Sequence, residues 1–345
     1  MNIGGHVIAR DGSPYIIAEL GVNHDGNVGR ALAMVDAAAA AGANAIKLQL
    51  FRAELLMSAA ARAAKYQERA GEGDPVAMLK RLELSTEELE QVCERAHERG
   101  VHAIVTVFSC ALVDEAEGMS IDAYKVASPD IVHRPLLEAL ARTGKPLIVS
   151  TGAATMDEVK RAAGWLDGVQ ERMALLQCVS AYPTPTEQAA LEGIGALRGA
   201  FAGMPIGYSD HTAGVETGAR AVELGAAILE KHFTYDRHAK GPDHAASLDA
   251  ERFAEYVRCA RATVHRPVDD GAKRVQDIEQ DVRAVSRQSI VTTRPVAAGE
   301  EIAREDLTFK RPGTGLEPWE VEEVVGRRAA RDIHFDVPMV REDVK

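Results

Sequence analysis

The chain has 345 residues and a formal net charge of −12 at pH 7. Its length suits one large domain and one small one, and its 46% hydrophobic and 27% charged residues are typical of a folded globular protein. The acidic balance argues against nucleic-acid binding, because that function needs a basic surface that replaces the counterions on phosphates.

No apolar run approaches the roughly 20 residues that span a bilayer, and the start of the chain lacks the layout of a signal peptide. We therefore expect a cytoplasmic protein with no membrane partner. The four cysteines, Cys93, Cys110, Cys178 and Cys259, lie far apart without paired spacing. This spacing favours reduced thiols over disulfides or a structural zinc site.

From about residue 14 to 262, a short β-branched apolar run followed by an amphipathic helix repeats along the chain. Eight runs fit the strand pattern: 15–19, 44–50, 102–108, 123–128, 146–151, 174–180, 205–210 and 226–233. Helices are indicated at 85–100 and 155–166, which begin with Ser or Thr caps and early acids. The pattern predicts a closed (β/α)₈ TIM barrel over residues 1–262 rather than an open doubly wound sheet.

Three segments depart from this repeat. Residues 53–80 are longer than a simple connection, and we expect an irregular active-site loop there. Residues 263–283 are polar and lack apolar periodicity, which is typical of a linker. Residues 284–345 contain short strand-like pieces between Pro and Gly, which predict a small β domain that docks on another surface because it is near the lower size limit for independent folding.

Polar side chains occur where the predicted strands end, and in a barrel these ends converge on the active site. They are Glu19, Lys47, Gln49, Thr106, Lys125, Ser128, Ser150, Thr151, Tyr182, Ser209, Asp210, His211, Glu230 and His232. The lysines and hydroxyls can bind phosphate and carboxylate groups. His211 and His232 end neighbouring strands and can share a divalent ion that polarises a carbonyl oxygen. The pattern indicates a lyase or synthase with a phosphate site and a metal site.

Each of these features also has a structural explanation. A histidine at a strand end can be a hydrogen-bonded structural residue, and a strand lysine can pair with a nearby glutamate. Residues 182–185 can form a rigid turn, and residues 209–212 can cap a helix. We favour the functional interpretation because ligand-type groups occur at the ends of all eight strands.

Nine segments carry a resemblance to a known family. They are IAELGVNHDG (17–26), AGANAIKLQLF (41–51), AYKVAS (123–128), STG (150–152), YPTP (182–185), GYSDHT (207–212), EKHFT (230–234), GPDH (241–244) and KRPGTG (310–315). Together they resemble the sialic acid synthase family, whose members make N-acetylneuraminic, legionaminic or pseudaminic acid. The match runs in order along nearly the whole chain, and its C-terminal part resembles the antifreeze-like SAF (β-clip) domain of that family.

The resemblance implies a TIM barrel that condenses phosphoenolpyruvate with an amino-sugar aldehyde. It implies a divalent metal, Mn²⁺ first with Mg²⁺ or Co²⁺ as alternatives, and a domain-swapped homodimer in which the SAF domain covers the partner's barrel. By residue, it implies a catalytic role for Glu19, metal ligation by His211 and His232, phosphoenolpyruvate binding by Lys47, Thr106, Lys125, Ser128, Ser150 and Ser209, and sugar or metal contacts by Gln49, Asp130, Tyr182 and Asp243. Arg311 would reach the acyl-amino group of the acceptor from the other subunit.

Three departures from the family pattern, at Val107, at residues 127–130 and at Ser180, leave the identity of the acceptor sugar open. A related synthase that acts on another aldose is one alternative, although the sequence has no second basic cluster for a distal phosphate. A Schiff-base aldolase at Lys47 or Lys125 is another. From a different class, the SAF-like region fits an ice-binding or carbohydrate-binding protein without catalysis.

Overall fold

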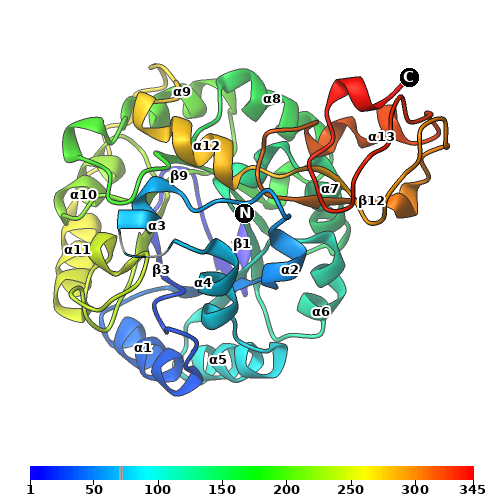
Figure 1. Cartoon of the computed structure of the whole chain (residues 1–345). Helices are drawn as coiled ribbons and strands as arrows, with labels where there is room; N and C mark the ends of the chain where they lie inside the picture. The colour runs from blue at the N-terminus through cyan, green and yellow to red at the C-terminus, as the bar shows by residue number, and fades with distance from the viewer. Residues whose placement is uncertain (70, 72) are drawn as a thin grey trace.

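The computed structural model describes residues 1–69, 71 and 73–345 of the chain. Its centre is a closed barrel of parallel strands in the order β10-β3-β4-β5-β6-β7-β8-β9 (Figure 1). The strands are β3 (Tyr15–Gly21), β4 (Ala45–Leu50), β5 (His102–Val107), β6 (Ala123–Val126), β7 (Leu147–Ser150), β8 (Met173–Cys178), β9 (Ile206–Asp210) and β10 (Ile228–His232). The predicted strands and their closure into one barrel are confirmed.

Helices follow the strands and form a ring around the barrel (Figure 1). They are α1 (Val28–Ala40), α5 (Thr86–Glu98), α6 (Val113–Glu117), α7 (Arg134–Arg142), α8 (Met156–Trp165), α9 (Glu192–Ala200), α10 (Glu216–Glu223) and α11 (Ala250–Ala262). Ser85 and Thr155 cap α5 and α8, and each forms a capping box with the glutamate three residues later. The capping side chains accept hydrogen bonds from backbone N–H groups of the first turn. The predicted caps are therefore confirmed.

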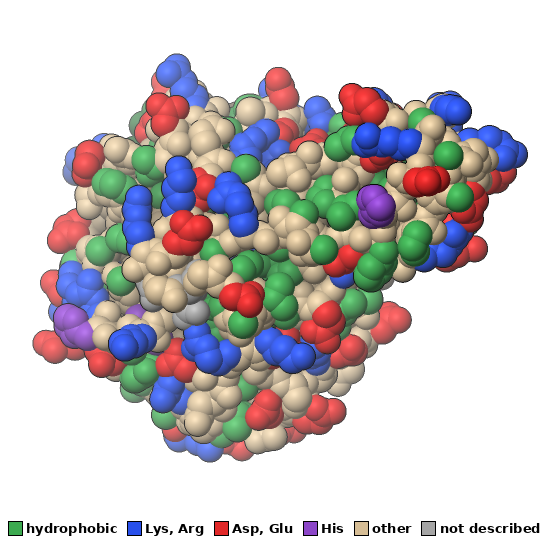
Figure 2. Space-filling view, in the orientation of Figure 1, with side chains coloured by type: hydrophobic (Ala, Val, Ile, Leu, Met, Phe, Trp, Pro, Cys, Tyr) green, Lys and Arg blue, Asp and Glu red, His purple; other side chains and the backbone are tan. Residues whose placement is uncertain are grey.

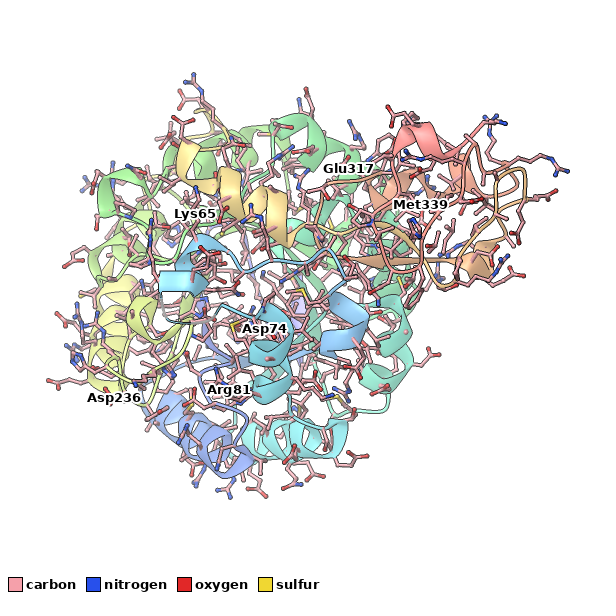
Figure 3. All side chains as sticks on the ribbon, in the orientation of Figure 1. Lys65, Asp74, Arg81, Asp236, Glu317 and Met339 are labelled. Carbon is pink, nitrogen blue, oxygen red and sulfur yellow. The ribbon has the colours of Figure 1, made fainter. Side chains whose placement is uncertain are left out.

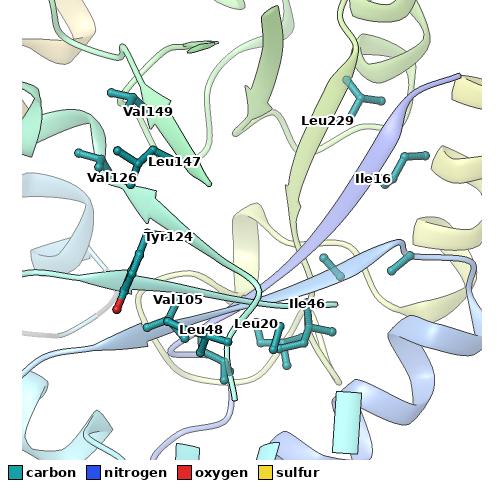
Figure 4. Close-up of a cluster of buried hydrophobic side chains, with 14 of the residues drawn as sticks. Ile16, Leu20, Ile46, Leu48, Val105, Tyr124, Val126, Leu147, Val149 and Leu229 are labelled. Atoms are coloured by element: carbon teal, nitrogen blue, oxygen red, sulfur yellow. The ribbon is translucent and has the colours of Figure 1, made fainter. Parts of the chain in front are cut away.

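A large hydrophobic core fills the space between the strands and the ring of helices. Side chains such as Ile46, Leu48 and Val149 point outward from the strands into this core (Figure 4). Because side chains alternate along a strand, the residues between them point into the barrel.

A smaller apolar core fills the interior at the amino-terminal end of the barrel. Ile17, Ile104 and Ile148 pack there with Ile3 and Ile8 of the N-terminal segment. This segment forms an antiparallel hairpin of β1 (Asn2–Ile3) and β2 (His6–Val7). The apolar plug closes this end, so a site for polar ligands lies at the other end, where the strands terminate.

Three short helices form the segment predicted as an irregular loop: α2 (Ala53–Leu56), α3 (Lys65–Arg69) and α4 (Pro75–Leu82). Apolar side chains of α2 and α4 form a small core with Phe51 and Phe108. Figure 3 places Lys65 and Asp74 of this segment on the face that covers the barrel mouth. The segment does contribute to the site, but its apolar contacts fold it into helices.

Residues 263–283 connect the barrel to the C-terminal domain and also pack against the barrel. The chain passes α9, where a Cβ at Gly195 would lie 1.9 Å from the carbonyl oxygen of Asp270, so only glycine fits this close approach. It then forms η6 (Asp277–Glu279) and α12 (Gln280–Ser286) over the barrel mouth (Figure 1). Apolar periodicity did not reveal this segment, because polar side chains and backbone contacts hold it in place.

The C-terminal region forms a small β-rich domain with its own core. It contains β11 (Ser289–Thr292), which pairs antiparallel with β12 (Leu307–Lys310), and α13 (Val321–Val324). Ile290, Phe309 and Met339 belong to its core. The domain docks beside α7 and α8 (Figure 1), and hydrophobic side chains gather where it meets the barrel (Figure 2). The predicted architecture of a barrel followed by a small β domain is confirmed.

Short 3₁₀ helices connect the larger elements. Besides η6 they are η1 (Cys110–Leu112), η2 (Ser128–Val132), η3 (Gln170–Arg172), η4 (Thr186–Gln188), η5 (His244–Ala246), η7 (Arg304–Asp306), η8 (Pro318–Glu320) and η9 (Arg341–Asp343). Within the described part of the chain, no helix has the length and apolar character needed to cross a membrane.

Candidate active site

The interior of the barrel changes from apolar to polar towards the carboxyl ends of the strands. Each strand carries an interior residue and, two positions further on, a second residue on the same side. The pairs are Ile17 and Glu19, Ala45 and Lys47, Ile104 and Thr106, Ala123 and Lys125, Ile148 and Ser150, Leu176 and Cys178, Gly207 and Ser209, and Ile228 and Glu230. The second members line a pocket at the carboxyl ends of the strands.

Lys47 lies at the centre of a buried charge cluster. Its Nζ lies 3.0 Å from Oε2 of Glu19 and 3.5 Å from Oε1 of Glu230, and donates to the hydroxyl of Thr106 at 3.4 Å. Burial raises the pKa of Glu19, with a further contribution from the charge of Glu230 and partial opposition from Lys47. Glu19 is therefore a carboxylate that can take up a proton more readily than an exposed one.

Lys125 forms the second cationic position of the pocket. Its Nζ donates to the hydroxyl of Ser150 at 2.6 Å and lies 3.7 Å from Glu230. Glu230 in turn accepts from the hydroxyl of Ser209 at 3.0 Å. Burial lowers the pKa of Lys125. Two lysines and several hydroxyls thus converge on one polar surface that can hold a phosphate or carboxylate.

His211 and His232 lie side by side beyond β9 and at the end of β10, with ring centroids 5.4 Å apart. Nδ1 of His211 donates to the carbonyl of Val179 at 2.8 Å, which leaves Nε2 as the ligating nitrogen of the neutral ring. Burial lowers the pKa of both imidazoles. Neutral imidazoles are the form that binds metal ions.

His232 has one acidic neighbour in the pocket, Asp243. Its Nδ1 lies 3.9 Å from Oδ2 of Asp243, outside hydrogen-bond distance, and is a buried polar atom without a partner. Among the described residues, no group of three or more His, Cys, Asp or Glu side chains is arranged to hold a metal ion. The two imidazoles and the unpartnered nitrogen fit a metal that takes its remaining ligands from substrate and water.

Aromatic and polar side chains form the outer part of the pocket. The ring of Tyr182 lies 4.2 Å from that of His211 and 4.9 Å from that of Tyr66. Gln49 donates to Glu19 at 2.9 Å. Burial raises the pKa of Asp243 to about 6. This mixture of ring faces and hydrogen-bonding groups is typical of a carbohydrate site.

Arg311 reaches the pocket of its own chain. The backbone N–H of Arg311 donates to the carbonyl of Leu56 at 2.8 Å, and its carbonyl accepts from the N–H of Ser58 at 3.0 Å. Its side chain is half-buried, with Nε buried and without a hydrogen-bond partner, and its guanidinium lies 5.5 Å from the centroid of Phe108. The predicted entry of Arg311 into a partner's barrel stays a prediction; within one chain, the loop of Arg311 contacts Leu56 and Ser58 beside the mouth of its own barrel.

The structure brings nearly all of the predicted residues together. Those that line the pocket are Glu19, Lys47, Gln49, Thr106, Lys125, Ser128, Ser150, Tyr182, Ser209, His211, His232, Asp243 and Arg311. Asp130 does not belong to the described lining; it is buried and accepts from Gln288 at 3.0 Å. The individual roles of these residues stay predictions.

Sequence reasoning missed several residues of the pocket. Tyr66 and Phe108 line it, as do Val282 and Ser286 of α12. Glu230 also lines the pocket, although the sequence predicts only that it ends a strand. Its alternation with Ile228 along the strand was the signal that could have placed it in the same polar layer as Glu19.

A closed parallel barrel with a polar pocket at the carboxyl ends of its strands is the architecture of a TIM-barrel enzyme. A family model described as "NeuB family" matches residues 34–270, and one described as "SAF domain" matches residues 287–345. The chain therefore belongs to the NeuB family, and the resemblance seen in the sequence is confirmed.

Relatives match along almost the full length of the chain. An N,N'-diacetyllegionaminic acid synthase from Legionella pneumophila is 34% identical and covers 96% of this chain and 94% of its own. An N-acetylneuraminate-9-phosphate synthase from Mus musculus is 31% identical and covers 96% and 92%. Among solved structures, the spore coat polysaccharide biosynthesis protein SpsE from Bacillus subtilis has a TM-score of 0.86, with 32% identity and coverage of 100% and 99%.

Proposed function

We propose that this chain condenses phosphoenolpyruvate with the open-chain aldehyde of an N-acetylmannosamine-type amino sugar, forming a nonulosonic acid and releasing phosphate. The observation that carries the proposal is the polar layer in which Lys47, Lys125 and Ser150 face the carboxylates of Glu19 and Glu230 in one pocket. The names of the relatives, which are synthases of this kind, support the same reaction class.

The lysine side of the pocket is the proposed phosphoenolpyruvate site. Lys47 and Lys125 supply two charges to a trianionic ligand, and Thr106, Ser128, Ser150 and Ser209 supply hydroxyl donors. Charge-assisted hydrogen bonds of this type are about twice as strong as neutral ones. They explain how a protein with a net charge of −12 binds an anion, because nearby buried charges outweigh screened distant ones.

His211 and His232 are the proposed metal ligands, with Mn²⁺ as the first choice and Mg²⁺ or Co²⁺ as alternatives. A bound divalent ion would supply Lewis-acid polarisation of the acceptor's carbonyl oxygen. The protein itself holds the aldehyde close to phosphoenolpyruvate, and this positioning offsets much of the entropy lost in a bimolecular encounter.

The reaction balances as follows. C3 of phosphoenolpyruvate bonds to the aldehyde carbon, whose oxygen becomes a hydroxyl. Water adds at C2, and the C–O bond to phosphate breaks to leave the 2-keto acid. We assign Glu19 as the general base that orients this water and takes its proton, because its carboxylate faces the pocket and burial raises its pKa.

The outer residues are the proposed acceptor site. Gln49, Tyr182 and Asp243 line the pocket, and the buried Asp130 lies close enough to Arg311 for their charges to interact. Arg311 carries the only described guanidinium in the lining, and we assign it to the acyl-amino carbonyl of the sugar. The test is phosphate release from phosphoenolpyruvate in the presence and absence of amino sugars, with loss of activity on chelation.

Three further features stay predictions. We propose a cytoplasmic homodimer. An exchange of C-terminal domains would form the same domain contacts between two chains that the structure forms within one. Sedimentation of the purified chain tests the dimer, and mixing of variants tests the exchange.

A further inference from the structure

Glu279 is a buried carboxylate outside the pocket lining of the described chain. It belongs to η6, between the segment that passes α9 and helix α12, and its exposure is 0%. Its Oε1 accepts from the N–H of Ala153 at 2.6 Å and from the N–H of Ser180 at 2.7 Å. Its Oε2 accepts from the N–H of Gln276 at 2.7 Å. One side chain therefore joins three separate backbone segments.

The Ser180 contact leads directly to a proposed metal ligand. The N–H of Ser180 and the carbonyl of Val179 belong to the same peptide group, which is planar and rigid. That carbonyl accepts from Nδ1 of His211 at 2.8 Å. Glu279 thus holds the peptide group that fixes the orientation and the tautomer of the His211 ring, in the manner of groups that support metal ligands.

The Ala153 contact leads to the proposed phosphoenolpyruvate site. Ala153 has φ of 51°, a left-handed conformation that costs free energy for any residue except glycine. The peptide before it is held as well, since the N–H of Gly152 donates to the hydroxyl of Ser128 at 2.9 Å. On its other side the carbonyl of Ala153 accepts from Arg287 at 3.2 Å and from Arg283. The contacts with Glu279 and the arginines therefore hold the loop in a strained shape.

The two loops also contact each other. A Cβ at Gly152 would lie 2.3 Å from the hydroxyl oxygen of Ser180 and 2.8 Å from that of Ser128. Movement of either loop would therefore displace the other.

We propose that Glu279 is a positioning residue that holds the loops after β7 and β8 together, and thereby aligns Ser128 for phosphoenolpyruvate and His211 for the metal. The inference rests on the proposed function and extends it: the segment before the C-terminal domain takes part in building the site. Glu279 acts because its side chain is long enough to accept hydrogen bonds from the N–H groups of Ala153 and Ser180 at the same time.

Two conservative variants separate the effect of side-chain length from the effect of charge. Glu279→Gln keeps the length of the side chain, and its single amide oxygen can accept from the N–H groups of Ala153 and Ser180, but it removes the charge and the acceptor of the Gln276 N–H. Glu279→Asp keeps the charge and shortens the side chain. Asp277→Asn is the matched control, because it removes an exposed carboxylate from the same 3₁₀ helix.

The measurements on the full chain are the Kd of Mn²⁺, the Kd of phosphoenolpyruvate, the Tm and hydrogen exchange of the amides of Ala153 and Ser180. We expect Glu279→Asp to weaken both ligands by about tenfold, as when a group that supports a metal ligand is lost, and to accelerate exchange of the two amides. Glu279→Gln should stay within about threefold of the wild-type affinities, and Asp277→Asn should change nothing.

Each other result overturns the inference. If Glu279→Asp leaves the two affinities and the exchange rates of the two amides unchanged, the length of the side chain is unimportant. A loss in Glu279→Gln with none in Glu279→Asp would assign the effect to charge. A lower Tm in Glu279→Asp with slow exchange at both amides would assign a global structural role. If the wild-type chain does not bind phosphoenolpyruvate, the proposed function fails, and amide exchange still decides whether Glu279 holds the two loops.

Discussion

Glu19 and Glu230 both face Lys47, yet their environments shift their pKa values in opposite directions. Burial is the largest influence on Glu19 and raises its pKa. Burial acts on Glu230 too, but the charges of Lys125 and Lys47 outweigh it and lower the pKa. Glu230 therefore stays ionised and balances the two lysines, whereas Glu19 is suited to exchange a proton.

Glu19→Gln should reduce kcat by roughly 10²-fold or more, because the general base is lost while its size is kept. In the wild-type enzyme, activity should fall as pH decreases through the raised pKa of Glu19, above the ordinary value of 4.5, since protonation removes the base. A pH profile of kcat/KM measures both effects. Near-normal activity of the variant with an unchanged acid limb would remove Glu19 from the mechanism.

His211→Ala and His232→Ala should each weaken Mn²⁺ binding by more than the roughly tenfold loss caused by removing a supporting group, because each removes a proposed ligand. Titration calorimetry on the metal-free chain measures this, and chelation of the wild-type enzyme should abolish phosphate release. His97→Ala, on the outer helix α5, serves as the control. Unchanged Mn²⁺ affinity in both site variants would exclude the two-histidine site.

At the scale of elements, the strands and their ends could be predicted because alternation and burial are local properties. The change from apolar Ile17 to polar Glu19, or from Ile148 to Ser150, is visible in the sequence, and barrel closure brings the polar residues into one pocket. The path of residues 263–286 could not be predicted, because it depends on backbone contacts such as those of Glu279 and on the space left by Gly195.

Arg311→Ala should raise KM for the acceptor by about 10-fold to 100-fold, the range expected for loss of a hydrogen bond from a charged group, and leave KM for phosphoenolpyruvate within about threefold. The loop that carries Arg311 is fixed on α2 through Leu56 and Ser58, so the lesion should stay local. Steady-state kinetics with each substrate varied measures the split. Arg304→Ala, in the same domain with its guanidinium 5.3 Å from Phe309, is the control. Equal changes in both KM values would contradict the assignment.

At the scale of the whole molecule, the C-terminal domain is attached to its own barrel by consecutive contacts. Arg283 and Arg287 donate to Glu158 of α8, at 2.7 and 2.8 Å, and Gln288 donates to the carbonyl of Phe108 at 2.9 Å. The chain thus runs from α12 into the domain without leaving the barrel. Within one chain, this path places Arg311 at the mouth of the same chain's barrel.

Mixing an Arg311→Ala chain with a Glu19→Gln chain tests this arrangement. If Arg311 serves its own barrel, every site in a mixed dimer carries one lesion, and no activity returns after subunit exchange. Return of activity would show that the domain serves the partner's barrel, because one site would then carry both lesions and the other neither. A mixture of Glu19→Gln with His232→Ala is the control, because both residues belong to the barrel and every mixed site therefore carries one lesion in either arrangement.

The condensation of phosphoenolpyruvate with an amino sugar can be measured directly. Purified chain with Mn²⁺ and phosphoenolpyruvate is incubated with N-acetylmannosamine, a diacetamido-trideoxymannose or its altrose analogue, and phosphate and product mass are measured. We predict equimolar phosphate and a 2-keto acid joined to the sugar carbon with at least one acceptor, and no phosphate without acceptor. Folded chain that binds phosphoenolpyruvate but releases no phosphate with any amino sugar, or that forms a borohydride-trapped pyruvate adduct on Lys47 or Lys125, would contradict the account.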